Sequence, residues 1–234
     1  MPFQYEIKEW DSDFFGYGVA SLTGWGDNDA FKVILKRMKE NNIRLCYWIF
    51  ESDRTELKEI ATGNEYHVAD VRLTFVCRKK NVQSPEFNKI RKLQWDDYND
   101  NLAGLAAQCG EYSRFRKDKT FPEGSFERMY TLWMQKALKE DIVFAYGEEK
   151  MTLGFAAVKG EPDGAHFYLL AVDGKARTKG IGKLLTQKIL SWSFENKYEK
   201  VFLLTQKENV PASKLFLSLG FEIEREEEIY HLWL

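Results

Sequence analysis

The sequence predicts a mixed α/β fold in two parts. Short apolar runs typical of buried strands alternate with segments that carry an apolar stripe at helical spacing. With 44% hydrophobic and 15% aromatic residues, the 234-residue chain can bury a substantial core. Residues 78–88 are polar, contain a proline and show no periodicity, as a linker does. We therefore expect a small N-terminal αβ domain over residues 1–83 and a larger domain over 84–234.

The first part alternates extended and helical segments. An apolar stripe predicts a helix over 28–42, and Gly63-Asn64 ends a second helix that begins at 54. The expected strands are residues 3–10, 16–24, 43–50 and 67–77, and the expected helices are 28–42 and 54–64.

The second part begins with helices and continues with strands. Aspartates provide capping signals at the start of its first helix, and Asn209 and Gly220 bound its last one. We expect a helix over 95–112, followed by a basic loop that begins at 113 and by a second helix after that loop. We expect two further helices, over about 181–192 and over 209–220. We expect a hairpin over 142–160 with its turn at 147–150, and strands over 165–172, 200–206 and 228–234. The dense charges of 222–230 indicate a solvated strand face.

Composition excludes several classes of protein. The formal charge of −2 argues against a protein held to nucleic acid by bulk charge. The start of the chain lacks the pattern of a secretion signal, and no window is apolar enough for a membrane helix. Cys46, Cys77 and Cys109 have no metal-ligand spacing, so we interpret them as reduced core thiols. We expect a cytoplasmic protein with no metal, no nucleic-acid partner and no membrane partner.

Residues 172–185, "VDGKARTKGIGKLL", have the composition of an anion site. Glycines allow main-chain N–H groups to approach a ligand closely, and the start of the following helix adds free N–H groups and the positive end of its dipole. Arg177 and Lys179 add formal charge. The segment is therefore suited to a pyrophosphate.

Two familiar phosphate motifs fit this segment badly. In an ATP-type P-loop, Arg177 would replace the first glycine and Leu184 the magnesium-binding Ser or Thr. In a dinucleotide fingerprint, Leu185 would replace the third glycine. The pattern [Arg/Gln]-x-x-Gly-x-[Gly/Ala] fits "RTKGIG" at every fixed position.

Together with its setting, this pattern resembles the GCN5-related N-acetyltransferase (GNAT) family over about residues 85–234. An apolar strand precedes the motif, and Asn209, Ala212, Leu215, Gly220 and Phe221 match the family's second motif. The resemblance implies the GNAT acyl-coenzyme A N-acyltransferase fold, with acetyl-coenzyme A as cosubstrate. It implies that the coenzyme is bound by Leu170, Ala171, Val172, Arg177, Thr178, Lys179, Gly180, Ile181, Gly182, Lys183, Asn209, Ala212 and Phe216.

A narrower resemblance concerns the acceptor. "WDSDFFG" (10–16), "YSRFR" (112–116) and the small αβ domain are similar to the TDP-fucosamine acetyltransferases. These enzymes acetylate the 4-amine of dTDP-4-amino-4,6-dideoxygalactose for bacterial surface polysaccharide biosynthesis. The resemblance implies a nucleotide-linked amino sugar as substrate. It implies substrate contacts from Phe15, Arg114 and Arg116, and Asp70 as a base acting through water.

The sequence departs from the family at Phe216, where the usual tyrosine could protonate the departing thiolate. Water, Tyr168 or Tyr230 are the alternative donors. Two other functions stay open: acetylation of another amine, in a metabolite or a protein, and a degenerate fold that binds acyl-coenzyme A without turnover. The sequence also leaves the acceptor's stereochemistry and a homodimer open.

Overall fold

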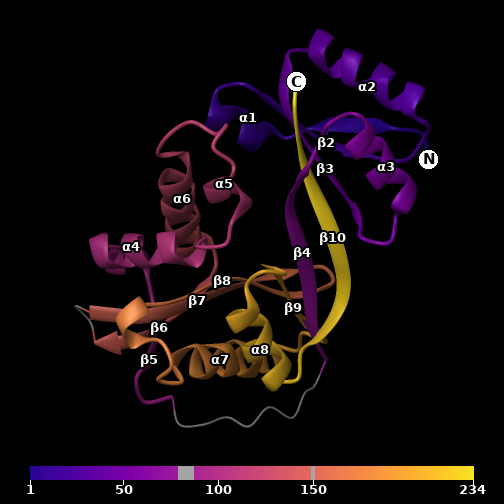
Figure 1. Ribbon diagram of the computed structural model, residues 1–234. Helices are drawn as coiled ribbons and strands as arrows, with labels where there is room; N and C mark the ends of the chain where they lie inside the picture. Colours follow the sequence, from indigo (N-terminus) through magenta and orange to yellow (C-terminus); the bar gives the residue numbers. More distant parts are fainter. Residues whose placement is uncertain (79–86, 149–150) are drawn as a thin grey trace. The chain divides into compact units, whose positions relative to one another are not determined.

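The computed structural model describes residues 1–78, 87–148 and 151–234 (Figure 1). The chain forms two compact units. The first contains Met1–Leu73, Lys117–Pro122 and Arg225–Leu234, and the second contains Thr74–Arg116 and Glu123–Glu224. The predicted boundary near residue 83 lies outside the described residues. Each unit therefore takes segments that are far apart in the sequence.

The first unit consists of a sheet with three helices. Its strands, in the order in which they pair, are β1 (Gln4–Ile7), β2 (Gly18–Thr23), β3 (Ile43–Glu51), β10 (Glu222–Trp233) and β4 (Val68–Cys77), the last two of which continue into the second unit. Its helices are α1 (Glu9–Phe15), α2 (Asn28–Glu40) and α3 (Thr55–Gly63). β2 and β3 are parallel, whereas β1 with β2 and β3 with β10 are antiparallel.

A tight aromatic core holds the first unit together. The ring of Trp48 on β3 stacks on that of Phe31 on α2 with 4.7 Å between centroids, and Tyr230 on β10 stacks on Phe50 at 5.3 Å. Alternation along the strands and the apolar stripe of α2 bring these side chains to one side of the sheet. Asp27 fixes the start of α2, since its carboxylate accepts a hydrogen bond from the Ala30 N–H at 2.8 Å.

The second unit surrounds a mixed sheet in the order β4-β9-β8-β7-β6-β5. Its further strands are β5 (Ile90–Lys92), β6 (Ile142–Glu148), β7 (Met151–Glu161), β8 (Gly164–Val172) and β9 (Val201–Gln206). Its helices are η1 (Trp95–Asp97), α4 (Asp100–Cys109), α5 (Arg114–Lys117), α6 (Ser125–Glu140), η2 (Gly174–Ala176), α7 (Ile181–Glu195) and α8 (Val210–Ser218). β5 to β8 are antiparallel neighbours, and β8 and β9 are parallel.

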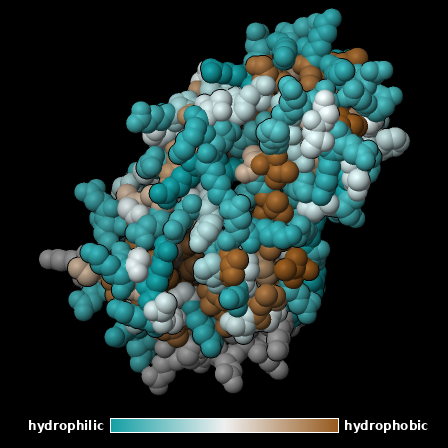
Figure 2. All heavy atoms as spheres, in the orientation of Figure 1, coloured by the Kyte–Doolittle hydropathy of each residue, from teal (hydrophilic) through white to brown (hydrophobic). Residues whose placement is uncertain are grey.

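Helices cover both faces of this sheet. α4 and α6 pack on one face of β6–β8 and α7 packs on the other (Figure 1). Buried residues of α4, α6 and strands β6–β8, among them Leu105, Met134 and Phe155, form one continuous core. Figure 2 shows that hydrophilic residues cover most of the viewed face and that hydrophobic residues gather in a few patches.

Several local predictions were wrong. Residues 9 and 10 are not extended but begin α1, in which Trp10 stacks on Phe14 one helical turn later at 5.1 Å. The helix expected over 95–112 is a 3₁₀ turn followed by α4, because the Asn99 side chain accepts from the Leu102 N–H and starts the helix there. The basic loop contains the short helix α5.

The charged face predicted for residues 222–230 is solvated only in part. Glu222–Arg225 are exposed, but Glu227 on β10 is buried, with 7% of its surface accessible. Its carboxylate accepts two hydrogen bonds from the Arg72 guanidinium, the shorter at 2.8 Å. Pairing with a cation allows this carboxylate to be buried where an isolated charge would be costly.

Candidate active site

The site begins where two parallel strands separate. β8 and β9 pair only at Ala165 with Val201 and at His166 with Phe202, near the start of each strand. Beyond these pairs the strands enclose a cavity of about 120 Å³. It is lined by Cys109, Tyr130, Trp133, Phe167, Tyr168, Leu169, Leu170, Leu203, Leu204, Thr205, Gln206, Asn209, Ala212 and Phe216. Beyond these pairs, backbone groups of β8 therefore do not bond to β9.

A second cavity, of about 590 Å³, lies at the carboxyl end of β8. Its walls are the end of α4, the turn between β8 and α7, and the start of α8. They consist of Gln108, Cys109, Glu111, Tyr112, Leu170, Ala171, Val172, Ala176, Arg177, Thr178, Gly180, Ile181, Gly182, Lys183, Asn209, Pro211, Ala212 and Leu215. This volume is within the range of small-molecule and cofactor sites. Four residues, Cys109, Leu170, Asn209 and Ala212, line both cavities, so the two adjoin there.

The turn between β8 and α7 is built to bind an anion. Thr178 and Gly180 adopt left-handed backbone conformations, with φ of 65° and 79°. α7 begins directly after Gly180, and the N–H groups of its first turn have no acceptor within the helix. Ile181, Gly182 and Lys183 carry these groups and line the larger cavity. The positive end of the helix dipole adds to them, so this turn suits a phosphate group.

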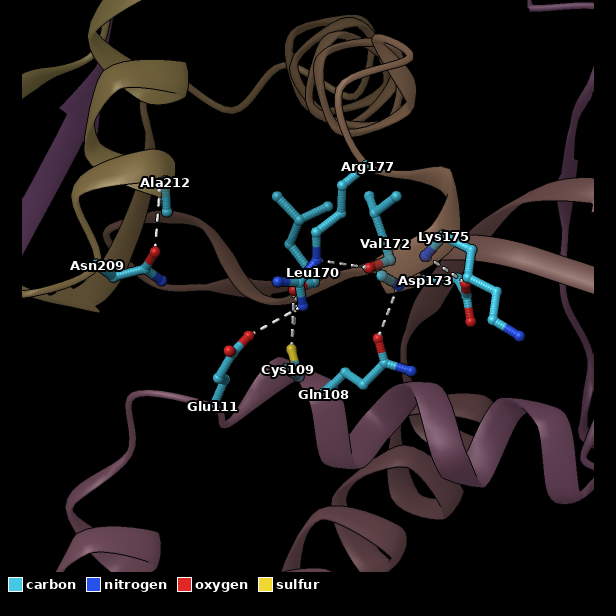
Figure 3. A network of polar contacts seen from close by, with 11 residues as sticks. Gln108, Cys109, Glu111, Leu170, Val172, Asp173, Lys175, Arg177, Asn209 and Ala212 are labelled. Carbon is cyan, nitrogen blue, oxygen red and sulfur yellow. Dashed lines mark hydrogen bonds and ion pairs between the residues drawn. The ribbon is translucent and has the colours of Figure 1, made fainter.

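Side chains hold the β8 end of this turn (Figure 3). Asp173 accepts a hydrogen bond from the Lys175 N–H at 2.9 Å, and Gln108 accepts one from the Gly174 N–H at 3.2 Å. Because Gln108 belongs to α4, its bond ties the turn to the helix on the other wall of the larger cavity. The turn is therefore held in place before a ligand binds.

Arg177 is held at the mouth of the larger cavity by an acidic neighbour. Its guanidinium forms an ion pair with the Glu111 carboxylate at 3.0 Å and donates from Nε to the Val172 carbonyl at 3.3 Å (Figure 3). Both side chains of the ion pair are about half exposed, so the pair is weak and screened by salt. An anionic ligand would compete with Glu111 for this cation.

Asn209 starts α8 at the place where the two cavities adjoin. Its amide oxygen accepts a hydrogen bond from the Ala212 N–H at 3.3 Å, and its amide nitrogen donates to Thr205 Oγ1 on β9. The prediction of Asn209 as the N-cap of this helix is confirmed.

Cys109 was predicted to be a core thiol, but the structure places it on the walls of both cavities. Cys46 and Cys77 are buried as expected, whereas Cys109 is half-buried at the end of α4. Its thiol donates to the Leu170 carbonyl and its Sγ accepts from the Leu170 N–H, both at 3.1 Å. Burial raises the pKa of this thiol to about 12, so it keeps its proton at neutral pH.

The aromatic hydroxyls near the site differ in their placement. Phe216 is buried against Phe167 and Phe221 and forms part of the wall of the smaller cavity. Tyr168 lines the same cavity and donates its hydroxyl to Asp141 at 2.6 Å; burial and this carboxylate raise its pKa. Tyr230 lies in the first unit and donates to Glu228.

Most residues predicted to bind the coenzyme lie together. All of them except Lys179, which is exposed, line one of the two cavities. Gln108, Cys109, Glu111, Tyr112 and Pro211 belong to the same walls and were not predicted as site residues. Only the sequence "QCGEY" at the end of a predicted helix, where polar residues interrupt the apolar stripe, could have indicated the first four.

The residues predicted to bind or activate the acceptor line neither cavity. Asp70 is buried on β4 in the first unit. Phe15 belongs to the same unit, and its ring lies 5.0 Å from that of Phe121 between centroids. Arg114 and Arg116 belong to the second unit. Their guanidinium groups lie 4.3 Å from the ring centroid of Phe115 and 5.6 Å from that of Phe126, respectively.

Two absences concern the described residues alone. Within residues 1–78, 87–148 and 151–234, no three or more His, Cys, Asp or Glu side chains are grouped to hold a metal ion. Over the same residues, no helix is long and apolar enough to cross a membrane.

Comparisons with known proteins agree with this geometry. The sequence profile of the acetyltransferase (GNAT) family matches residues 87–221, which is more than half of the chain. The structure is similar to a GCN5-related N-acetyltransferase from Sphaerobacter thermophilus, with a TM-score of 0.66 and 12% identity over 99% of this chain and 76% of that one. It is also similar to a functionally unknown conserved protein from Staphylococcus epidermidis, with a TM-score of 0.65 and 10% identity over 94% and 86%.

A curated relative matches a shorter stretch. An N-acetylaspartate synthetase from Xenopus tropicalis is 34% identical over 76 residues, which are 32% of this chain and 28% of that protein. The match thus spans under a third of the relative's length. The family profile and the fold carry the assignment, and both confirm the prediction from the two sequence motifs. The chain belongs to the acetyltransferase (GNAT) family.

Proposed function

We propose that the protein transfers the acetyl group of acetyl-coenzyme A to the amine of a nucleotide-diphosphate amino sugar such as dTDP-4-amino-4,6-dideoxygalactose. The observation that carries the coenzyme part is the pair of adjoining cavities at Leu170, with the turn before α7 on the walls of the larger one. A long ligand with phosphates at one end and a reactive group at the other matches this arrangement.

The coenzyme's pyrophosphate binds at the start of α7, where N–H groups, Arg177 and Lys183 supply donors and positive charge. Its arm follows Leu170–Val172 on β8, whose backbone groups beyond the paired segment face the gap. The coenzyme supplies the activated thioester. The backbone of Leu170 lies where the two cavities adjoin, on the path of this arm.

The acceptor amine reaches the acyl group from the smaller cavity. Its aromatic walls, which include Tyr130 and Trp133, suit the apolar face of a deoxy sugar. The narrower resemblance in residues 10–16 and 112–116 supports the nucleotide sugar as acceptor. Arg114 and Arg116, two cations that rest on aromatic rings, bind its diphosphate. The same resemblance implies Phe15 as a substrate contact.

Two proton transfers complete the reaction. The narrower resemblance implies Asp70 as a base that acts through water. The departing thiolate takes a proton from water or from Tyr168, because Phe216 has none to give. Tyr168 remains protonated at neutral pH, since burial and its hydrogen bond to Asp141 raise its pKa.

An assay of thiol release tests the acceptor. The purified protein is mixed with acetyl-coenzyme A and one amine at a time: dTDP-4-amino-4,6-dideoxygalactose, related 4-amino sugars, L-aspartate and a peptide with a free N-terminus. We expect thiol release with the nucleotide amino sugars. L-aspartate is included because the curated relative is named N-acetylaspartate synthetase. Release with L-aspartate or the peptide alone would reject the nucleotide sugar.

The replacement at Phe216 supports one alternative, a module that binds acyl-coenzyme A without turnover. Acetyl-coenzyme A would then raise the melting temperature while every acceptor leaves thiol at background. The variant Phe216→Tyr separates the two functions. A modest change in an existing rate supports the enzyme, whereas activity that appears only in the variant supports the module. A cytoplasmic location and a homodimer remain predictions.

A further inference from the structure

The backbone of Leu170 is the point at which the two cavities adjoin. Leu170 lies opposite Ala156 of β7, but its N–H and its carbonyl both bond to the Cys109 thiol. In a β-strand, both groups of one residue project toward the same edge. This edge is the one that β9 leaves after His166 and Phe202. The thiol therefore takes the place that a neighbouring strand would occupy.

A thiol can bond to both groups because sulfur accepts a hydrogen bond while S–H donates one. The amides in the arm of an acyl-coenzyme A offer the same pair, a carbonyl acceptor and an N–H donor. Burial keeps the Cys109 thiol protonated, since its pKa is raised to about 12. The donor part of the contact is therefore present at neutral pH. The thiol and a coenzyme amide make equivalent demands on Leu170.

We propose that Cys109 occupies the coenzyme's hydrogen-bonding place at Leu170 in the free protein, and that acyl-coenzyme A binds by displacing this thiol and joining the two cavities. Cys109 is thus a positioning residue that acts through Leu170. It holds the edge of β8 in place before binding, and its own bonds are lost when the coenzyme binds. This inference rests on the proposed coenzyme site, and it adds a residue that sets the affinity of that site.

The two walls at the junction explain why the thiol can move. Cys109 is the last residue of α4, and Gly110 follows it, so the side chain stands at the end of a helix and not in its middle. It is half-buried, with open space on both sides in cavities of about 590 and 120 Å³. In this proposal the thiol is displaced by a change of side-chain rotamer.

Calorimetric titration with acetyl-coenzyme A tests the proposal. In Cys109→Ala the coenzyme displaces nothing, so we expect its Kd to fall about five-fold. In Cys109→Ser the hydroxyl bonds to Leu170 more strongly than the thiol does, so we expect the Kd to rise about five-fold. Cys77→Ala is the matched control. It removes a buried thiol of the same unit that lines neither cavity, and it leaves the Kd unchanged. An unchanged or higher Kd in Cys109→Ala overturns the proposal.

A measurement on the unaltered protein covers the case in which a variant fails to fold. Acetyl-coenzyme A has no S–H group, so an infrared difference spectrum with and without it reports the S–H stretches of the protein alone. We expect a difference band, because the Cys109 S–H loses its bond to the Leu170 carbonyl. The absence of such a band in a saturated sample overturns the proposal.

The outcomes also separate this proposal from the proposed function. If acetyl-coenzyme A fails to bind the unaltered protein, both are rejected. If it binds and a nucleotide amino sugar is acetylated while the Cys109→Ala Kd is unchanged, only the role of Cys109 is rejected. If the Kd changes as expected and no nucleotide sugar reacts, the role of Cys109 stands and the acceptor is wrong.

Discussion

Replacing Gly182 by alanine separates coenzyme binding from folding. Gly182 is in the first turn of α7 and lines the larger cavity. A Cβ atom built there would lie 3.4 Å from Leu215 Cδ2 and 3.7 Å from Val172 Cγ2. These are ordinary contacts, so the free protein accepts the methyl group. Alanine is also the better helix former, which adds up to about 1 kcal/mol to the free energy of unfolding.

The same methyl group enters the cavity in which we propose that the coenzyme binds. Leu215 of α8 and Val172 of β8 both line the larger cavity, so the new group lies between two of its lining side chains. The glycine N–H then loses its close approach to a phosphate. We expect the Kd for acetyl-coenzyme A to rise at least about ten-fold, which corresponds to about 1.4 kcal/mol.

Calorimetric titration and urea unfolding measure the two quantities for Gly182→Ala. Gly104→Ala is the control, because Gly104 is an exposed glycine of α4 with no heavy atom within 4 Å of its Cβ position, and it lines neither cavity. The control gains stability and keeps its affinity. If Gly182→Ala binds acetyl-coenzyme A as tightly as the unaltered protein at equal stability, the passage of the coenzyme along this turn is refuted.

Three further predictions concern single side chains. Glu111→Gln frees Arg177 from its ion pair, so we expect the Kd for acetyl-coenzyme A to fall about two- to three-fold at low salt and this gain in affinity to shrink as salt is added. The free energy of unfolding changes by less than about 0.5 kcal/mol, because the pair is half exposed. A gain in affinity that is independent of salt would contradict this prediction. Asn209→Ala removes the N-cap of α8, which lowers the unfolding free energy by about 1 kcal/mol and the melting temperature by about 2–4 °C in a thermal scan; an unchanged midpoint would show that the cap contributes nothing. Burial raises the pKa of Asp118, but hydrogen bonds, the strongest from His231 at 2.6 Å, outweigh it and hold the pKa below its ordinary 3.8. A carboxylate whose pKa is depressed by folding stabilises the protein at pH values above its ordinary pKa, and this stability is lost as the pH falls through the folded-state pKa. We therefore expect the free energy of unfolding, measured with urea, to fall more below about pH 4 in the unaltered protein than in Asp118→Asn. Equal losses in the two proteins would contradict this linkage.

Local chemistry explains why part of the site could be predicted. The turn at 172–182 and the start of α8 depend on residues within one helical turn of each other, namely the glycines, the free N–H groups and the cap Asn209. The positions of the strands could also be predicted locally, from apolar runs in the sequence. The helix at Glu9–Phe15 could not be predicted so easily, because aromatic residues there favour both strand and helix until Trp10 stacks on Phe14.

The sequence by itself determined the family and the backbone turn at the start of α7, since backbone conformation and capping are set by neighbours along the chain. The tertiary structure decided the rest of the site. Whether β8 and β9 stay paired or separate depends on packing across the whole sheet. Only that separation brings Cys109 onto Leu170, 61 residues further along the chain. Contacts between such distant residues leave no periodic signal in the sequence, because each partner is positioned by a different element.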